Sequence, residues 1–222
     1  NGLNCAWGDE FQFDLLKFVE DWKPSASATV TCSPDLLRWS NNYSKLFNQR
    51  PDLSTIRIPD KPEGVGPMRL IVVAKELVEW TKDRPLEGVQ EALKKYFRGW
   101  EYDNDLDEAI STNDRDPKNG SYAIWIKDVQ EADPEFANKS ADDLKAEGHI
   151  GITVLERQLL EADYFFEKGE HLDRQNVTLC SGSRARDGHV PGCYWRVSGE
   201  FDVDLYYSSH RDPSLRSRRV WA

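Results

Sequence analysis

The chain has 222 residues, of which 39% are hydrophobic and 11% aromatic, enough apolar material for a folded core. Its formal net charge of −10 and pI near 5.0 argue against nonspecific binding to nucleic acid or to an anionic membrane, since both need a positive field. No apolar run has the length of a membrane span and no signal-peptide pattern is visible, so we expect no direct membrane insertion.

Residues 1–66 are predicted to form an N-terminal extension or subdomain. Apolar residues recur at helical spacing in two stretches, 11–22 and 34–47, with a Ser/Thr-rich link between them. Prolines and glycines then gather over residues 59–67 and make the clearest linker of the chain. We therefore expect a second domain to occupy residues 67–222.

The second domain is predicted to combine strands with two main helices. The β-branched run 68–74 and the segment 122–126 predict buried strands, and apolar spacing predicts a helix over 85–97. A second helix is predicted over 153–168, where Thr153 and Glu156 have the spacing of a capping box and Gly169 can end the helix. These elements predict the α+β class.

The C-terminal part is predicted to be rich in strands and turns. Residues 193–197 and 201–205 alternate apolar with polar side chains, so one face should be buried and the other should carry polar groups. A loop over 206–211 would continue the polar face. An ordinary hairpin with one solvated face has the same alternation.

The composition of residues 184–212 is unusual for a solvated strand face. The segment contains no Lys, Gln, Met, Asn, Ile or Thr, and it is rich in Tyr, Ser, Gly, Asp, His and Arg, the side chains of antibody-like binding surfaces. All of its residues except Trp195 and Glu200 can be encoded by codons that end in C or T. Such a bias is expected where AAC or AAT codons are randomised at their first two bases. We interpret the segment as a binding surface without a reaction centre.

A resemblance to a known family supports this interpretation. The run TLCSGSR (178–184), followed by Asp187-Gly188, Val190-Pro191, Trp195 and LRSR (215–218), resembles the C-terminal region of variable proteins of diversity-generating retroelements. Residues 113–128 and 169–173 resemble the framework of the same family, so the resemblance covers residues 67–222. The chain departs from the family at its end, LRSRRVW, where many members have Gly-Phe-Arg.

The resemblance implies a C-type-lectin-like fold related to the formylglycine-generating-enzyme type, with antiparallel strands, two main helices and a long turn-rich C-terminal β region. It implies a non-catalytic protein of prokaryotic or viral origin that binds a ligand, either a protein or a cell-surface molecule, without a cofactor. The variable region would span residues 184–214. The sequence assigns no localisation, and a cell or virion surface is one alternative.

Carried over position by position, the resemblance separates variable residues from scaffold residues. The variable, ligand-facing positions are Ala185, Arg186, His189, Gly192, Tyr194, Arg196, Asp202, Asp204, Tyr206, Tyr207, Ser209, His210 and Arg211. The scaffold positions are Gly182, Ser183, Arg184, Asp187, Gly188, Pro191, Trp195, Leu215, Arg216 and Arg218. We expect alanine at Tyr194, Arg196, Tyr206 or Tyr207 to leave folding nearly intact, and substitution of Trp195 or Arg216 to damage it.

Two other classes of function remain as alternatives. In an enzyme, Arg184, Arg186, Asp187 and His189 would form an anion-binding and acid–base cluster that acts on an anionic substrate. The same Arg-Asp-Gly run is also turn chemistry, in which Asp187 bonds its own backbone. In a structural assembly protein, the variable positions would instead be buried in a subunit contact.

No metal site is predicted. Asp103, Asp105 and Asp107 have the spacing of a calcium loop, but Glu108 stands where glycine is needed and Asp114 where glutamate is usual, so a solvated acidic helix start is favoured. The four histidines are scattered along the chain.

The four cysteines Cys5, Cys32, Cys180 and Cys193 are far apart and have no metal-binding spacing. Free, mostly buried thiols are predicted. A Cys5–Cys32 or a Cys180–Cys193 disulfide is the alternative.

Overall fold

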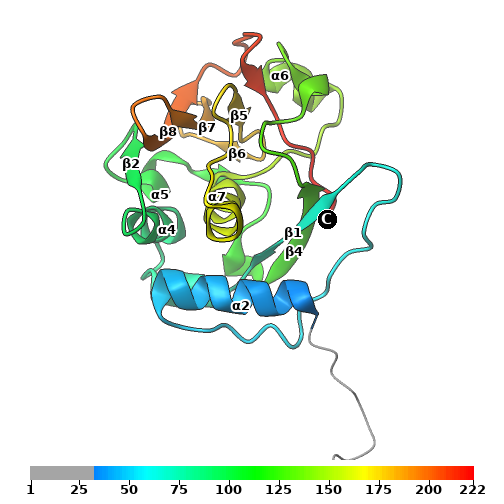
Figure 1. Ribbon diagram of the computed structural model, residues 1–222. Helices are drawn as coiled ribbons and strands as arrows, with labels where there is room; N and C mark the ends of the chain where they lie inside the picture. The colour runs from blue at the N-terminus through cyan, green and yellow to red at the C-terminus, as the bar shows by residue number, and fades with distance from the viewer. Residues whose placement is uncertain (1–32) are drawn as a thin grey trace, which may run out of the picture. The chain divides into compact units, whose positions relative to one another are not determined.

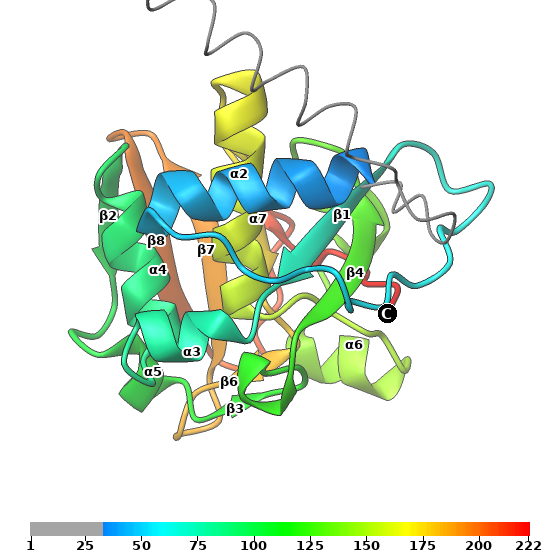
Figure 2. The same cartoon turned by 90° about the horizontal axis from the view of Figure 1, so that it is seen from below.

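Helix α7 (Val154–Lys168) lies at the centre of the computed structural model, which describes residues 33–222 (Figures 1 and 2). Its residues from Val154 to Tyr164 are buried on every side, polar side chains included. Figure 1 looks along its axis, with sheet strands and the helices α2 (Pro34–Phe47) and α4 (Pro85–Leu93) around it. The helix predicted over residues 11–22, together with Cys5 and Cys32, lies outside the described residues.

The ends of α7 are where the sequence predicts them. The hydroxyl of Thr153 accepts a hydrogen bond from the Glu156 backbone N–H, and the Glu156 carboxylate accepts one from the Thr153 N–H. Gly169 ends the helix in the left-handed conformation, with a φ of 69°. The capping box and the glycine C-cap are therefore confirmed.

A two-stranded antiparallel sheet covers one side of α7. It pairs β1 (Met68–Val73) with β4 (Tyr122–Lys127), and all six residues of β1 are buried. Both strands were predicted from short apolar runs, and both are confirmed.

A five-stranded sheet covers another side of α7, in the order β2-β8-β7-β5-β9. Its strands are β2 (Arg98–Glu101), β5 (Val177–Leu179), β7 (Val190–Arg196), β8 (Glu200–Tyr206) and β9 (Leu215–Arg216). The pairs β2–β8 and β5–β9 are parallel, whereas β5–β7 and β7–β8 are antiparallel. The α+β class and the strand-rich C-terminal region are confirmed, but the sheets are mixed and not purely antiparallel.

Shorter elements connect these layers. They are α3 (Glu76–Trp80), α5 (Leu106–Ala109), β3 (Thr112–Asn113), η1 (Pro117–Asn119), η2 (Pro134–Phe136), α6 (Ala141–Ala146) and β6 (Ser183–Arg184), with β3 paired to β6. Over residues 33–222, no helix has both the length and the apolar character needed to cross a membrane.

Helix α2 is part of the same core as the sheets. Trp39, Tyr43 and Leu46 have no exposed surface. The Trp39 indole donates to the Leu70 carbonyl at 2.7 Å, and the Tyr43 hydroxyl donates to the Val72 carbonyl at 2.9 Å. The domain boundary predicted after residue 66 thus falls inside one compact unit, Ser33–Ala222.

The helix predicted over 85–97 ends earlier, because α4 stops at Leu93. The next four residues form a turn that leads directly into β2. This turn brings the Phe97 ring edge-on to the rings of Trp195 and His171, 5.5 and 5.0 Å away between centroids. Aromatic packing against a distant part of the chain therefore overrides the local helical spacing.

A buried carboxylate connects α7 to the C-terminal segment. Asp173 has no exposed surface and accepts hydrogen bonds from Arg157 Nε at 2.9 Å, Arg218 Nη2 at 2.7 Å, Thr178 Oγ1 at 2.6 Å and the Ala132 N–H at 2.8 Å. Arg218, a predicted scaffold residue, is thus fixed by a charge in the core.

Candidate ligand-binding face

The hairpin β7–β8 separates the core from a polar surface by a single layer of backbone. Cys193, Phe201 and Val203 point into the core and are buried. The interleaved residues stand on the opposite side, where Tyr194 pairs with Asp202 and Gly192 with Asp204. The alternation read from the sequence is confirmed for residues 193–196 and 201–204. Val197, predicted on the buried face, is instead fully exposed in the turn after β7, and Leu205 is only half-buried. We call this side of β2, β7 and β8, with the bordering loops 185–189 and 207–211, the outer face.

Arg196 lies on the outer face at the turn end of the hairpin, where it stands opposite Glu200. The Arg196 guanidinium lies 2.5 Å from the Asp202 carboxylate and 4.9 Å from the centre of the Trp100 ring. Asp202 has no exposed surface. Burial raises the pKa of its carboxyl, although contacts with Tyr194 and Arg196 oppose the rise.

Two tyrosines of the hairpin pack on a small apolar cluster, Tyr194 opposite Asp202 and Tyr206 at the end away from the turn. Tyr194 and Tyr206 pack against buried side chains contributed by β5, β7, β9 and α6, which are Val177, Leu179, Val190, Leu215 and Ala141. Their rings are half-buried, so the cluster fixes them while part of each stays open to solvent.

The predicted variable residues differ in exposure. Arg186, Tyr207, Ser209, His210 and Arg211 are exposed. His189, Tyr194, Arg196, Asp204 and Tyr206 are half-exposed. Ala185, Gly192 and Asp202 are buried, so these three meet no ligand in this conformation.

Two residues of the outer face lie outside the predicted variable segment. Trp100 in β2 and Tyr102 just after it are exposed by 37% and 59%. Strand β2 has only four residues and follows directly on a helical pattern, so no alternation marked it as a strand. The two aromatic residues at alternate positions were the only available signal.

Gly192 couples two of the predicted variable positions. A Cβ atom at this residue would lie 2.5 Å from Tyr206 Cε2 and 2.8 Å from Val177 Cγ1. We expect Gly192→Ala to cost about 1 kcal/mol of unfolding free energy through overpacking, and less in a Tyr206→Ala background. Urea unfolding of both single variants and the double variant measures this coupling. Strictly additive costs would contradict it.

Tyr207 is a predicted variable residue with little packing against the fold. Its side chain is 71% exposed and its main contact is with the His189 ring, 4.5 Å away between centroids. We expect Tyr207→Ala to change the free energy of unfolding by no more than about 0.5 kcal/mol, as is usual for surface substitutions. A thermal or urea unfolding curve tests this, and a clearly larger loss would show that Tyr207 supports the fold.

Three of the four residues of the enzyme alternative make structural contacts, and the fourth, His189, has its Nδ1 atom 2.7 Å from the Asp187 carboxylate. Arg184 Nη1 donates to the Ser181 and Ser183 carbonyls, both at 2.7 Å. Arg186 pairs with Glu108 at 2.9 Å. The Asp187 carboxylate accepts the His189 backbone N–H at 3.1 Å, next to Gly188 with a φ of 87°, which is the turn predicted for Arg-Asp-Gly.

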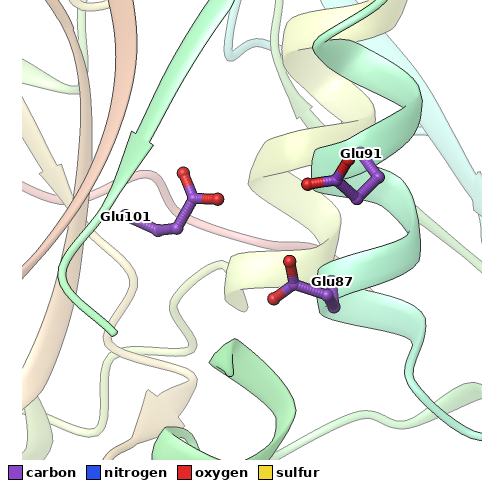
Figure 3. A group of neighbouring side chains, drawn as sticks. All are labelled: Glu87, Glu91 and Glu101. Carbon is purple, nitrogen blue, oxygen red and sulfur yellow. The ribbon is translucent and has the colours of Figure 1, made fainter. Parts of the chain in front are cut away.

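A group of three carboxylates in the described residues lies close enough to hold a cation. Glu87 and Glu91 of α4 face Glu101 of β2 (Figure 3). The Lys94 ammonium already pairs with Glu91 at 2.7 Å and with Glu101, and the Glu87 carboxylate accepts the Leu106 N–H. Lys94 therefore offsets part of the negative charge of the group, and the Leu106 N–H satisfies the third carboxylate.

The calcium-like aspartates cap backbone groups. Asp105 accepts the Glu108 N–H and so caps α5, as expected for a helix start, while Asp107 accepts the N–H groups of Leu86 and Glu87.

Cys180 and Cys193 are free, buried thiols whose sulfur atoms lie 3.6 Å apart. Burial raises the pKa of the Cys180 thiol, so it stays protonated at neutral pH. For this pair, the prediction of free thiols is confirmed.

Comparison of the chain with protein-family models, with curated proteins and with solved structures gives no match. The functional argument therefore depends on the residues of the outer face.

Proposed function

We propose that this protein is a non-catalytic ligand-binding protein whose outer face is diversified by a retroelement, on a C-type-lectin-like domain. The observation that supports the proposal is the division of residues within β7 and β8. Within the hairpin, the predicted variable residues stand on the outer face, and the residues between them, such as Cys193, Phe201 and Val203, are buried. Substitutions could therefore change the outer face while the core side chains stay the same.

The chemistry of the outer face suits variable recognition. Tyrosine and arginine offer large contact areas and directed hydrogen bonds, and they are enriched at binding hot spots. The sheet beneath them is held by α7 and by the Asp173 contacts, so the backbone that presents these side chains is rigid. We expect the ligand to be a protein or a cell-surface molecule.

The nucleotide sequence of the gene and its flanks provides a direct test of the proposed function. Sequencing the region that encodes residues 184–212, with its flanks, should reveal a near-copy of these codons beside a reverse-transcriptase gene. The copy should differ mainly where it has adenine. We expect those differences at exposed and half-exposed positions such as Arg196, Tyr206 and Tyr207, and not at Trp195 or Phe201.

Ordinary flanks and mixed codon endings would contradict diversification. The turn that carries Arg186, Asp187 and His189 would then be the first place to test for activity.

A further inference from the structure

A hollow lies where β8 meets the loops of the outer face, and tyrosines from separate parts of the chain surround it. Its volume is about 290 Å³, and its lining includes Tyr102, Tyr206, Tyr207, His189, His210 and Asp187. Tyr102 follows β2, far from the other five in the sequence. We call this hollow the tyrosine pocket.

The aromatic rings of the tyrosine pocket are available to a ligand. Tyr102 is 59% exposed and Tyr207 is 71% exposed. Tyr206 is fixed from below by the apolar cluster and stacks on His210, with ring centroids 6.3 Å apart and planes 20° from parallel. The fixed Tyr206 ring and the two exposed rings, Tyr102 and Tyr207, can together contact a small ligand group from several sides.

The tyrosine pocket is lined by one carboxylate, that of Asp187, which lies 2.7 Å from His189 Nδ1. The His189 N–H that bonds this carboxylate holds its pKa below the usual range, so it is ionised at neutral pH. Burial is the main cause that raises the pKa of Tyr206, and the nearby Asp204 carboxylate adds to the rise. Within residues 33–222, Asp204 makes no ion pair.

No arginine or lysine lines the tyrosine pocket. The arginines of the bordering loops are paired elsewhere, Arg186 with Glu108 and Arg211 with Asp143 at 2.6 Å. An anionic ligand group would therefore meet the Asp187 carboxylate without an arginine or lysine beside it.

We propose that the tyrosine pocket binds an organic cation, either the basic side chain of a protein ligand or a quaternary ammonium group, with Tyr102 as a constant anchor. The inference rests on the proposed function of the outer face and names the ligand group that this part would take. Aromatic faces attract cations that lie within about 6 Å of the ring centre, and a nearby carboxylate adds to the attraction. Because Tyr102 lies outside residues 184–212, diversification would leave it unchanged.

The test uses two cations and a neutral analogue. The folded protein is titrated with choline, with N-acetyl-arginine amide and with 3,3-dimethylbutan-1-ol, the uncharged analogue of choline, and binding is followed by NMR. We expect both cations to bind saturably and choline to bind at least about fivefold more tightly than the alcohol, as one cation–π contact predicts. Tighter binding of choline would indicate a quaternary ammonium group as the ligand. Tighter binding of N-acetyl-arginine amide would indicate the basic side chain of a protein ligand.

Variants identify the contributing residues. We expect Tyr102→Ala to weaken choline binding about threefold to fivefold, the effect of one exposed cation–π contact, and Tyr102→Phe to retain it because the ring remains. Asp187→Asn keeps an acceptor for the His189 N–H and removes the charge, so it should also weaken binding. Tyr96→Ala, which alters an exposed tyrosine outside the lining, is the matched control.

Equal binding of choline and the alcohol, absence of saturable cation binding, or equal effects of Tyr102→Ala and Tyr96→Ala would each overturn the inference. These outcomes can be separated from failure of the proposed function. If the near-copy is found beside a reverse-transcriptase gene while choline does not bind, only the cation inference fails.

Discussion

Asp173→Asn is expected to destabilise the protein by about 3–5 kcal/mol, the usual cost of removing one partner from a buried ionic group. Asp173 faces two buried arginines, Arg157 and Arg218, and the substitution leaves their charges without this counter-ion. Asparagine is the appropriate replacement because Asp173 has a φ of 53°, which asparagine tolerates better than alanine does. Urea unfolding measures the loss, and Arg174→Ala at the exposed neighbouring position is the control.

The pH dependence of the Asp173 variant provides a second readout. Although burial alone would raise the pKa of this carboxyl, Arg218 and Arg157 lower it below the ordinary value. A lowered folded-state pKa contributes stability that is present above the unfolded pKa of about 3.9 and is lost as the pH falls through the folded value. The difference between wild type and Asp173→Asn should therefore shrink below about pH 4. A variant as stable as wild type at pH 7 would refute the role given to this network.

Arg196→Ala is expected to cost about 2 kcal/mol, although Arg196 is a predicted variable residue. The substitution leaves the fully buried Asp202 carboxylate without its cation, and we take the lower end of the usual cost because the Arg196 side chain is 35% exposed. This differs from the sequence-based expectation that alanine at this position is nearly neutral. The buried partner, which the sequence does not reveal, is the reason.

A second variant tests that cause. In an Asp202→Asn background, Arg196→Ala should cost clearly less, because no buried charge is left unpaired. The pKa of Asp202 is already raised, so its ionised form costs stability as the pH rises above the unfolded value of about 3.9. The loss in Arg196→Ala should accordingly be smaller at pH 4 than at pH 7. Equal losses in both backgrounds would exclude Asp202 as the cause.

The Asp173 network and the Arg196–Asp202 pair have different consequences for a diversified surface. Asp173 belongs to the scaffold, and its contacts extend to Arg218 near the end of the chain. Arg196 and Asp202 are both predicted to vary, yet they depend on each other. If the face is diversified, some combinations of outer-face residues will be more stable than others.

Local signals in the sequence determined the class of the protein and several of its elements. The capping box of Thr153 and Glu156 and the glycine at 169 define α7, because a helix end is decided by bonds among residues close in sequence. The alternation in 193–205 identified the two faces of β7 and β8, because side chains of a strand point to opposite sides in turn.

Only the tertiary structure decided which of these residues share a surface. The sequence did not place Tyr102 beside Tyr207, because strand β2 joins β8 by a parallel pairing between residues about a hundred positions apart. It also did not reveal that Ala185, Gly192 and Asp202 are buried or that α4 ends before Phe97. These features depend on packing between distant segments, whereas periodicity and capping report only on neighbours along the chain.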